Sequence, residues 1–465
     1  MSRKFQVKAV PSSWIEHNGR RLDCGPYVSG AVEAKELLHR LSARKNQLQE
    51  LTAGGISGII NAGRITRLWV DDNQHGFPFL SSTDILQADL SNISYIAKSV
   101  ARQNSQLLIK DRWTLITRSG TIGRMAYSRS DMNGMACTED VLRIIPDEEK
   151  VKPGYIYAYL SSRFGVPLII SGTYGAIIQH IEPHHIADLP VPRLRAVEEQ
   201  AHELIQRAAE LRSEANRLLA DVTKILEIEI GGGRVEWQHG HVQAFAINTT
   251  TFNSSVSRLD AFHHIGYVGE AIEKAVVPLV EVQNYARALR PPIMKRIRVE
   301  DGGYEFLGGS ELVTLEQRTE TRISARTPNI DQYIVHPGYV LFQCVGQRYG
   351  LFGRPVLANR HLYGKAVTEA VMRLIPHDIR DAGYISVYLA TGFGQRLGMR
   401  FSAGTSIPVL QEEGARKILI YWPDEKRRHA ISRIAEQAWE NRAQATELED
   451  QARTLVERAI EEGGR

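Results

Sequence analysis

The chain carries the same sequence framework twice, and this duplication constrains its fold more than any other feature. Residues 138–146 (TEDVLRIIP) return at 368–376 (TEAVMRLIP), and a Gly-Tyr-Ile tripeptide follows each copy. A repeat of so long a period predicts two domains built on one scaffold, rather than a solenoid. The shorter blocks that recur in the same order are RLD at 21–23 and 258–260, and GFPFL at 76–80 with GYEFL at 303–307.

The composition is compatible with two soluble domains. A chain of 465 residues is long enough for each half to bury a core of its own. The cysteines Cys24, Cys137 and Cys344 lack paired spacing, so they predict neither a disulfide framework nor a zinc site. The N-terminal residues lack a signal peptide, and no run of about 18 apolar residues occurs. We therefore expect a cytoplasmic protein without membrane contact, whose net charge of +4 permits nucleic-acid binding without requiring it.

Each half has the pattern of a mixed α/β domain. Short apolar runs at 141–145 and 371–375 predict strands bounded by Gly, Asp and Pro, and helical patches follow at 155–162 and 384–390. The regular strand-helix-strand alternation of a doubly wound sheet is missing. The pattern therefore predicts the α+β class, with two mixed α/β domains in tandem.

Two long heptad segments close the two halves. Small residues alternate with larger, mostly aliphatic ones at spacings of three and four, which is typical of a closely packed coiled coil. Asn441 within the second seam is a residue type that fixes register at some cost in stability. The predicted seam positions are Ala201, Leu204, Ala208, Leu211, Ala215 and Leu218 in the first helix, and Ile434, Ala438, Asn441, Ala445, Leu448, Ala452 and Leu455 in the second.

The matching seams favour an antiparallel pair of helices, although each helix could instead pack on its own domain. About 30 residues at about 1.5 Å each make a rod near 45 Å, comparable with the roughly 34 Å turn of B-DNA. Such a rod could act as a ruler between two domains. The predicted boundaries are 1–195 for the first domain, 196–230 for the first helix, 231–423 for the second domain and 424–462 for the second helix.

Glycine-containing loops follow a predicted strand in each half, at 117–124 and 343–350. Arginine can bind guanine with two hydrogen bonds, glutamine can pair with adenine, and small hydroxyl residues can contact phosphates. Tight turns with exposed polar residues are the alternative interpretation. The candidate DNA contacts are Arg118, Ser119, Thr121 and Arg124 in the first loop and Gln343, Gln347, Arg348 and Tyr349 in the second.

A local basic cluster lies in the second half. Lys295, Arg296 and Arg298 are close together there, and we include them among the candidate DNA contacts. A solvated surface without a partner is the alternative interpretation of these charges.

Motifs of catalysis are missing from the sequence. It contains no phosphate-binding loop, no His-Glu-x-x-His, no Cys-x-x-Cys, no Gly-x-Ser-x-Gly and no Asn/Asp-Pro-Pro-aromatic tetrapeptide. The cluster of His180, Glu182, His184 and His185 contains metal-ligating residue types, but the second half has no counterpart to it. We therefore expect no catalytic residue, no cofactor and no metal in this chain.

The sequence resembles the specificity (S) subunits of Type I restriction-modification systems, from Arg21 to about Glu461. The most specific block precedes the first helix. The second copy keeps Gly404 and Thr405, but residues 418–423 (ILIYWP) replace the proline pair and no Glu-Gln pair follows. The block comprises Ser171-Gly172-Thr173, Ile177, Ile181, Ile186, Leu189-Pro190-Val191-Pro192 and Glu199-Gln200.

The resemblance implies a non-catalytic DNA-binding subunit. Its two target recognition domains would read the two halves of a split sequence in double-stranded DNA, and its spacer helices would fix the gap. Its partners would be two methyltransferase subunits, which bind S-adenosylmethionine, and restriction/translocase subunits for phage defence. A protein-binding coiled-coil adaptor is the alternative, and a self-contained modification enzyme is a third interpretation.

Overall fold

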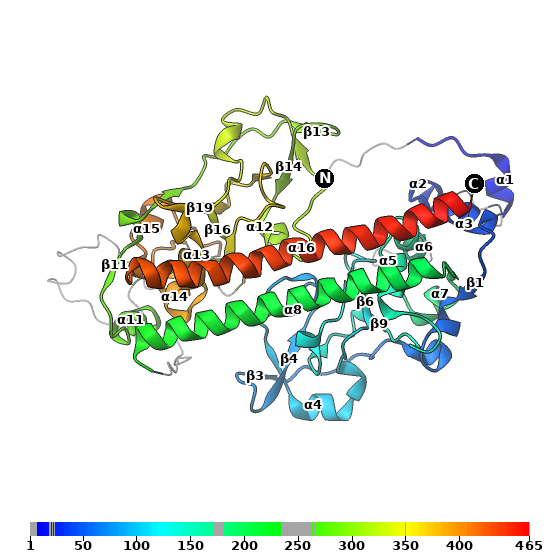
Figure 1. Cartoon of the computed structure of the whole chain (residues 1–465), viewed down its shortest axis with the longest axis horizontal. Helices are drawn as coiled ribbons and strands as arrows, with labels where there is room; N and C mark the ends of the chain where they lie inside the picture. The colour runs from blue at the N-terminus through cyan, green and yellow to red at the C-terminus, as the bar shows by residue number, and fades with distance from the viewer. Residues whose placement is uncertain are drawn as a thin grey trace. The chain divides into compact units, whose positions relative to one another are not determined.

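The computed structural model describes residues 7–17, 20, 22, 24–171, 180–233, 263, 266–348, 350–404 and 406–464 (Figure 1). These residues belong to two compact units. Unit 1 comprises Met1–Ser213 and Gln444–Arg465, and unit 2 comprises Glu214–Ala443. Each unit therefore contains a globular domain and part of each long helix.

Unit 1 mixes short helices with short strands, and the first long helix, α8, begins within it. Its elements are α1 (Ser12–His17), α2 (Gly25–Val28), α3 (Ala31–Arg40), β1 (Lys45–Gln47), β2 (Ile59–Ile60), β3 (Trp69–Val70), β4 (Gly76–Leu80), β5 (Tyr95–Ala97), α4 (Lys98–Gln103), β6 (Thr114–Thr117), β7 (Met125–Tyr127), β8 (Ala136–Cys137), β9 (Val141–Ile144), α5 (Pro153–Leu160), α6 (Gly165–Ser171), α7 (Pro183–Ile186), β10 (Pro190–Pro192) and α8 (Ala196–Gly231).

Unit 2 repeats the order of the strands, and the second long helix, α16, begins within it. Its elements are α11 (Gly266–Glu273), β11 (Leu279–Glu281), β12 (Ala286–Leu289), β13 (Arg298–Val299), β14 (Tyr304–Leu307), α12 (Gly309–Leu312), β15 (Arg322–Ile323), β16 (Val340–Gln343), β17 (Pro355–Leu357), β18 (Ala366–Val367), β19 (Val371–Pro376), α13 (Ala382–Ala390), α14 (Gly392–Arg400), α15 (Glu412–Arg416), β20 (Leu419–Tyr421) and α16 (Glu425–Gly463).

The sheets of the two units have the same topology. Unit 1 contains sheets of order β2-β9-β6-β7, β3-β5-β4-β8 and β1-β10, and unit 2 contains β12-β19-β16-β17, β13-β15-β14-β18 and β11-β20. Strands pair antiparallel except for β4 with β8 and β14 with β18, which are parallel at equivalent places. The prediction of two tandem α+β domains on one scaffold is confirmed.

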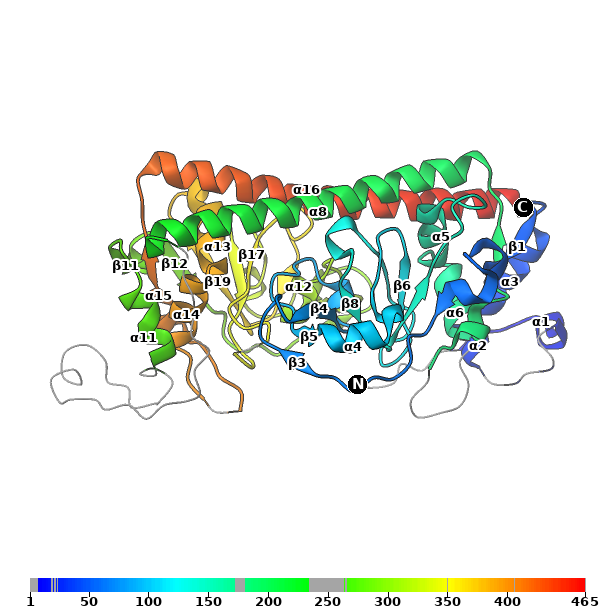
Figure 2. The ribbon, with the colours of Figure 1, turned by 90° about the horizontal axis from the view of Figure 1, so that it is seen from below.

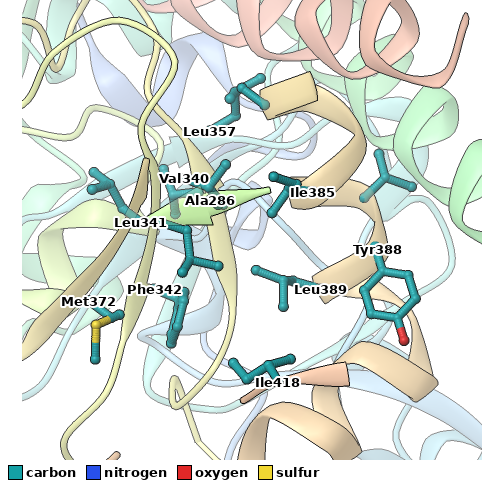
Figure 3. Packing of buried hydrophobic residues seen from close by; sticks show 14 of the residues in the cluster. Ala286, Val340, Leu341, Phe342, Leu357, Met372, Ile385, Tyr388, Leu389 and Ile418 are labelled. Atoms are coloured by element: carbon teal, nitrogen blue, oxygen red, sulfur yellow. The ribbon is translucent and has the colours of Figure 1, made fainter. Parts of the chain in front are cut away.

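A central helix packs on the first sheet of each unit. In unit 2, Leu341 and Phe342 on β16, Met372 on β19, and Ile385 and Leu389 on α13 belong to one buried apolar cluster (Figure 3). In unit 1, α5 takes the place of α13, and Figure 2 shows it beside α8, with α4 and β3 farther from that helix. These contacts form the main apolar core of each unit.

The repeated Gly-Tyr-Ile tripeptide marks the place where each central helix meets a long helix. A Cβ atom on Gly154 would lie 2.9 Å from the backbone of His202 on α8, and one on Gly383 would lie 2.6 Å from the backbone of Ser432 on α16. Only glycine allows so close an approach. The adjacent tyrosine hydroxyls donate to backbone carbonyls of the strand that precedes the long helix, through Tyr155 in unit 1 and Tyr384 in unit 2.

Gly383→Ala is expected to destabilise unit 2 by about 1–3 kcal/mol, because the added methyl group must push α13 away from α16. Gly269 on α11 is a matched control, since a Cβ there meets no atom within 4 Å. Gly269→Ala should stabilise the helix by up to about 1 kcal/mol. Hydrogen exchange of unit 2 peptides measures both effects, and equal protection in the two variants would contradict the close-approach argument.

The long helices run antiparallel where unit 2 contains both of them. Asn216 on α8 contacts Arg442 on α16, with 2.8 Å between Oδ1 and Nη2, whereas Glu229 farther along α8 pairs with Arg427 nearer the start of α16. The contact order on one helix is thus the reverse of that on the other.

The alanines assigned to the seam are buried, whereas most of the larger buried residues lie one position after those assigned. The seam alanines are fully buried on both helices. They are Ala201, Ala208 and Ala215 on α8, and Ala438, Ala445 and Ala452 on α16. Other buried positions of the two helices include Ile205, Arg212, Leu226, Ala435, Arg442, Glu449 and Val456.

The aliphatic residues assigned to the second seam position therefore lie at its margin. Leu204, Leu218, Leu448 and Leu455 are only partly buried, and Ile434 is 37% exposed. Leu211 and Asn441 are buried beside the seam. The displacement has a physical reason, because polar side chains that bond across the seam take buried positions which apolar periodicity does not detect.

Candidate nucleic-acid interface

Strand registers identify the equivalent residues of the two units. Ile60 pairs with Arg143 in unit 1, and Leu289 pairs with Arg373 in unit 2. Arg143 and Arg373 hold the same place in the repeated block, so their strand partners Ile60 and Leu289 are equivalent. The next residues along the chain, Asn61 and Arg290, therefore correspond to each other. Six positions farther, Arg67 corresponds to Arg296 by the same count.

A buried arginine holds one loop of each unit in place. Arg143 donates to the carbonyls of Cys137, Thr138 and Val141, and Arg373 donates to those of Val367, Thr368 and Val371. Burial lowers the pKa of Arg373 to about 10, so it stays protonated at neutral pH. Each arginine thereby fixes the turn that carries Glu139 in unit 1 or Glu369 in unit 2.

The Arg118 side chain is fastened to its own domain. It is 12% exposed, pairs with Glu182 and donates to the carbonyls of Ile181 and Glu139. Asn61 donates to the same Glu182 carboxylate at 3.0 Å. Arg118 therefore positions the neighbouring loops. It is not free to contact a DNA base, as its residue type had suggested.

In unit 2 another residue supplies the equivalent guanidinium. Arg290 donates to the carbonyl of Glu369 and, at 2.6 Å, to the side chain of Gln411. Glu369 corresponds to Glu139 within the repeated block. Gln411 corresponds to Glu182, because the residue before each donates the same backbone hydrogen bond, Ile181 to the carbonyl of Arg118 and Leu410 to that of Cys344. The two domains thus maintain one loop arrangement with arginines from different positions in the chain.

The glycine loops differ in length as well as in sequence. Residues 118–124 connect β6 to β7, whereas 344–354 connect β16 to β17, so the second loop is longer. Cys344, and not Arg348, corresponds to Arg118. Arg348 instead bonds to the Ser402 hydroxyl and to the carbonyls of Ser402 and Gly404. Length differences of this kind cannot be seen from the two glycine motifs alone.

The predicted loop residues divide into bonded and exposed groups. Ser119 donates to Asp140 at 2.8 Å, and the Gln343 amide donates to the carbonyl of Val345 at 2.7 Å. The side chains that face solvent are Thr121 and Arg124 in unit 1 and Gln347 in unit 2. Tyr349 lies outside the described residues. No hydrogen bond joins these three side chains to the part of the chain that the structure describes, so they can reach a ligand without breaking one there.

The basic cluster of unit 2 lies on the segment that leads into β13. Lys295, Arg296 and Arg298 are exposed. Arg296 also pairs with Glu369 and lies over the ring of Phe306. Its unit 1 counterpart, Arg67, makes the same contacts with Glu139 and Phe79 on the segment that leads into β3. No sequence motif marks Arg67 as the counterpart of Arg296, because only the strand register aligns the two segments.

The carboxylates in two groups of metal-ligating residue types are paired with arginines. Glu182 pairs with Arg118, and the His185 ring accepts a hydrogen bond from the Glu182 backbone. A second group contains Asp378, Asp381 and His429 in unit 2, with ligand atoms within 4.8 Å of one another. Hydrogen bonds from Arg380 lower the pKa of Asp378 to about 2, and Arg428 pairs with Asp381. Both carboxylates are thus neutralised by arginines.

The cysteines offer no reactive thiolate at neutral pH in the core. All three are free, and burial raises the pKa of both Cys137 and Cys344 to about 11. Within the described ranges, none of the helices is both long and apolar enough to cross a bilayer.

Comparison with known proteins gives one curated relative and several solved structures. No family model matches the chain. The Type I restriction enzyme EcoBI specificity subunit of Escherichia coli is 25% identical over 158 residues, which are 34% of this chain and 33% of that protein. The chain thus matches the curated relative over about a third of the relative's length. This match supports the resemblance to Type I specificity subunits that the sequence predicts.

The solved structures share less sequence identity with the chain than the curated relative does. The S subunit of a Type I system from M. genitalium shares 10% identity, with 91% of this chain and 96% of that chain covered and a TM-score of 0.38. The HsdS subunit from Thermoanaerobacter tengcongensis shares 13% identity, with coverages of 90% and 96% and a TM-score of 0.27. At these scores the two matches carry no argument about this chain.

Proposed function

We propose that this chain is the DNA-recognition subunit of a Type I restriction-modification complex. Each of its two domains binds one half of a split target in double-stranded DNA, and the paired helices set the gap between the halves. The chain itself supplies recognition and no bond-breaking chemistry. Methyltransferase subunits that bind S-adenosylmethionine, and restriction/translocase subunits, bring the reactions to the selected site.

The observation that carries this proposal is the contrast between framework and loops. The sheets, the buried arginine and the arginine-glutamate pair recur in both units. The exposed side chains of the loops differ, with Thr121 and Arg124 in one unit and Gln347 in the other. Two readers of different sequences need this combination, because phosphate contacts position a domain while base contacts select the sequence.

The exposed loop side chains have the chemistry that base recognition requires. Arginine can donate two hydrogen bonds to guanine, and glutamine can donate to and accept from adenine. Because Arg118 and Arg348 are bonded within their own domains, the free candidates are Arg124 in unit 1 and Gln347 in unit 2. Lys295 and Arg298 add positive charge that would favour contact with the phosphate backbone.

Genome-wide adenine methylation tests the proposal. Cells that carry the chain with its neighbouring methyltransferase are compared with cells that lack only the chain. A split motif with a constant gap that disappears with the chain is the expected result. Active methyltransferase without any chain-dependent motif would contradict the proposal and favour a protein-binding adaptor.

A further inference from the structure

Arg67 and Arg296 form the same arrangement in the two units although the segments around them differ. In unit 1, Nη2 of Arg67 lies 3.4 Å from a Glu139 carboxylate oxygen and 3.2 Å from the Thr138 hydroxyl. In unit 2, Nη2 of Arg296 lies 2.9 Å from Glu369 and 3.4 Å from the Thr368 hydroxyl. One terminal nitrogen of each guanidinium is therefore held by the domain.

An aromatic ring supports each guanidinium from one side. The guanidinium carbon lies 5.4 Å from the ring centre of Phe79 in unit 1 and 5.0 Å from that of Phe306 in unit 2. Glu369, which holds Arg296, stays ionised at neutral pH: burial raises its pKa, but backbone and side-chain hydrogen bonds and Arg296 outweigh this and lower it. The orientation of the planar group is thus fixed by a ring and a carboxylate.

The remaining donors of each arginine are available. All hydrogen bonds of Arg67 and Arg296 with described residues use Nη2, which leaves Nε and Nη1 without a protein partner in that part of the chain. The two side chains are 39% and 38% exposed. Nε and Nη1 point to different sides of the guanidinium, so each can donate a separate charge-assisted hydrogen bond to a phosphate oxygen.

Stability alone does not account for the repetition of this arrangement. A half-exposed ion pair contributes only about 0–1 kcal/mol. The residues that follow differ, with Leu68-Trp69 in unit 1 and Ile297-Arg298 in unit 2. A cation that recurs among divergent exposed neighbours has the distribution expected of a contact to the part of DNA that does not vary, its backbone.

We infer that Arg67 and Arg296 are equivalent phosphate contacts, one for each half of the DNA target, which orient the two domains alike without reading a base. The inference rests on the proposed function. It assigns these two arginines a role separate from that of the loop residues Arg124 and Gln347, which face the bases.

The test uses the chain assembled with its methyltransferase subunits. The DNA contains the motif that this complex methylates in cells. Binding is titrated over a range of KCl concentrations for Arg67→Ala, Arg296→Ala and the double variant. Each single change should weaken binding about tenfold and reduce the slope of log affinity against log salt by about one, and the double change by about two. Arg67→Lys and Arg296→Lys should keep the slope, because the charge remains.

Matched controls are Arg163→Ala and Arg380→Ala. These arginines are exposed and ion-paired like the pair under test, but their partners include α16 residues, Glu457 for Arg163 and Glu425 for Arg380. Their slopes should equal that of the unsubstituted complex. Unchanged slopes for Arg67→Ala and Arg296→Ala, or a changed base in the methylated motif, would overturn the inference. An unsubstituted complex that does not prefer its motif over scrambled DNA would instead overturn the proposed function.

Discussion

Arg373→Met is expected to destabilise unit 2 by about 3–5 kcal/mol. The side chain is fully buried, and its guanidinium donates to the carbonyls of Tyr333, Val367, Thr368 and Val371. Methionine fits an apolar site but cannot donate to any of these oxygens, and each buried polar group left unsatisfied costs about 1–3 kcal/mol. Relief of the cost of burying a charge offsets part of this loss.

Hydrogen-exchange mass spectrometry measures the effect on unit 2 in the full chain. Amide hydrogen exchange should become faster in β16, β18 and β19, and also in the rest of unit 2. Arg287→Met is the matched control, because Arg287 lies on the adjacent strand β12 with an exposed side chain. Equal protection in the two variants would show that the buried hydrogen bonds of Arg373 do not stabilise the unit.

The second large effect is expected at the polar contact within the helix seam of unit 1. Arg212 on α8 is 3% exposed and donates from Nε and Nη2 to both carboxylate oxygens of Glu449 on α16, which is 6% exposed. Removing one partner leaves a buried charge without compensation. Arg212→Met or Glu449→Met alone should therefore cost about 3–5 kcal/mol.

The double variant distinguishes an ion pair from two independent residues. With both charges removed, the buried seam is apolar, and the loss should be much smaller than the sum of the single losses. Chemical denaturation of the unsubstituted chain, the two single variants and the double variant gives the coupling free energy between the two side chains. Additive losses would mean that the two side chains do not stabilise the helix pair together.

The sequence predicted the architecture well because the chain is duplicated. Each repeated block marks an equivalent element, so the two α+β domains followed from the order of the blocks. The alanine seam also followed from periodicity, since Ala201 and Ala208 lie seven residues apart. The position of Arg212 did not follow, because a charged residue at a buried seam position breaks the apolar pattern that defines the heptad.

The candidate interface was predictable only in part. Arg124 and Gln347 stay candidates, and their exposure is compatible with a contact to DNA. The ion pair between Arg118 and Glu182 joins residues far apart in the sequence, so no local sequence pattern predicts it. A signal for Arg143 and Arg373 was present, since one arginine recurs within an apolar strand of the repeated block.

We propose that the two domains read the two halves of the target separately. Adenine methylation is sequenced in cells that carry the chain with Thr121→Ala and Arg124→Ala, and in cells that carry it with Gln347→Ala. We expect the first chain to change or relax one half of the motif and the second chain the other half, with the gap unchanged in both. Equal loss at both halves in either chain, or an unaltered motif in both, would contradict it.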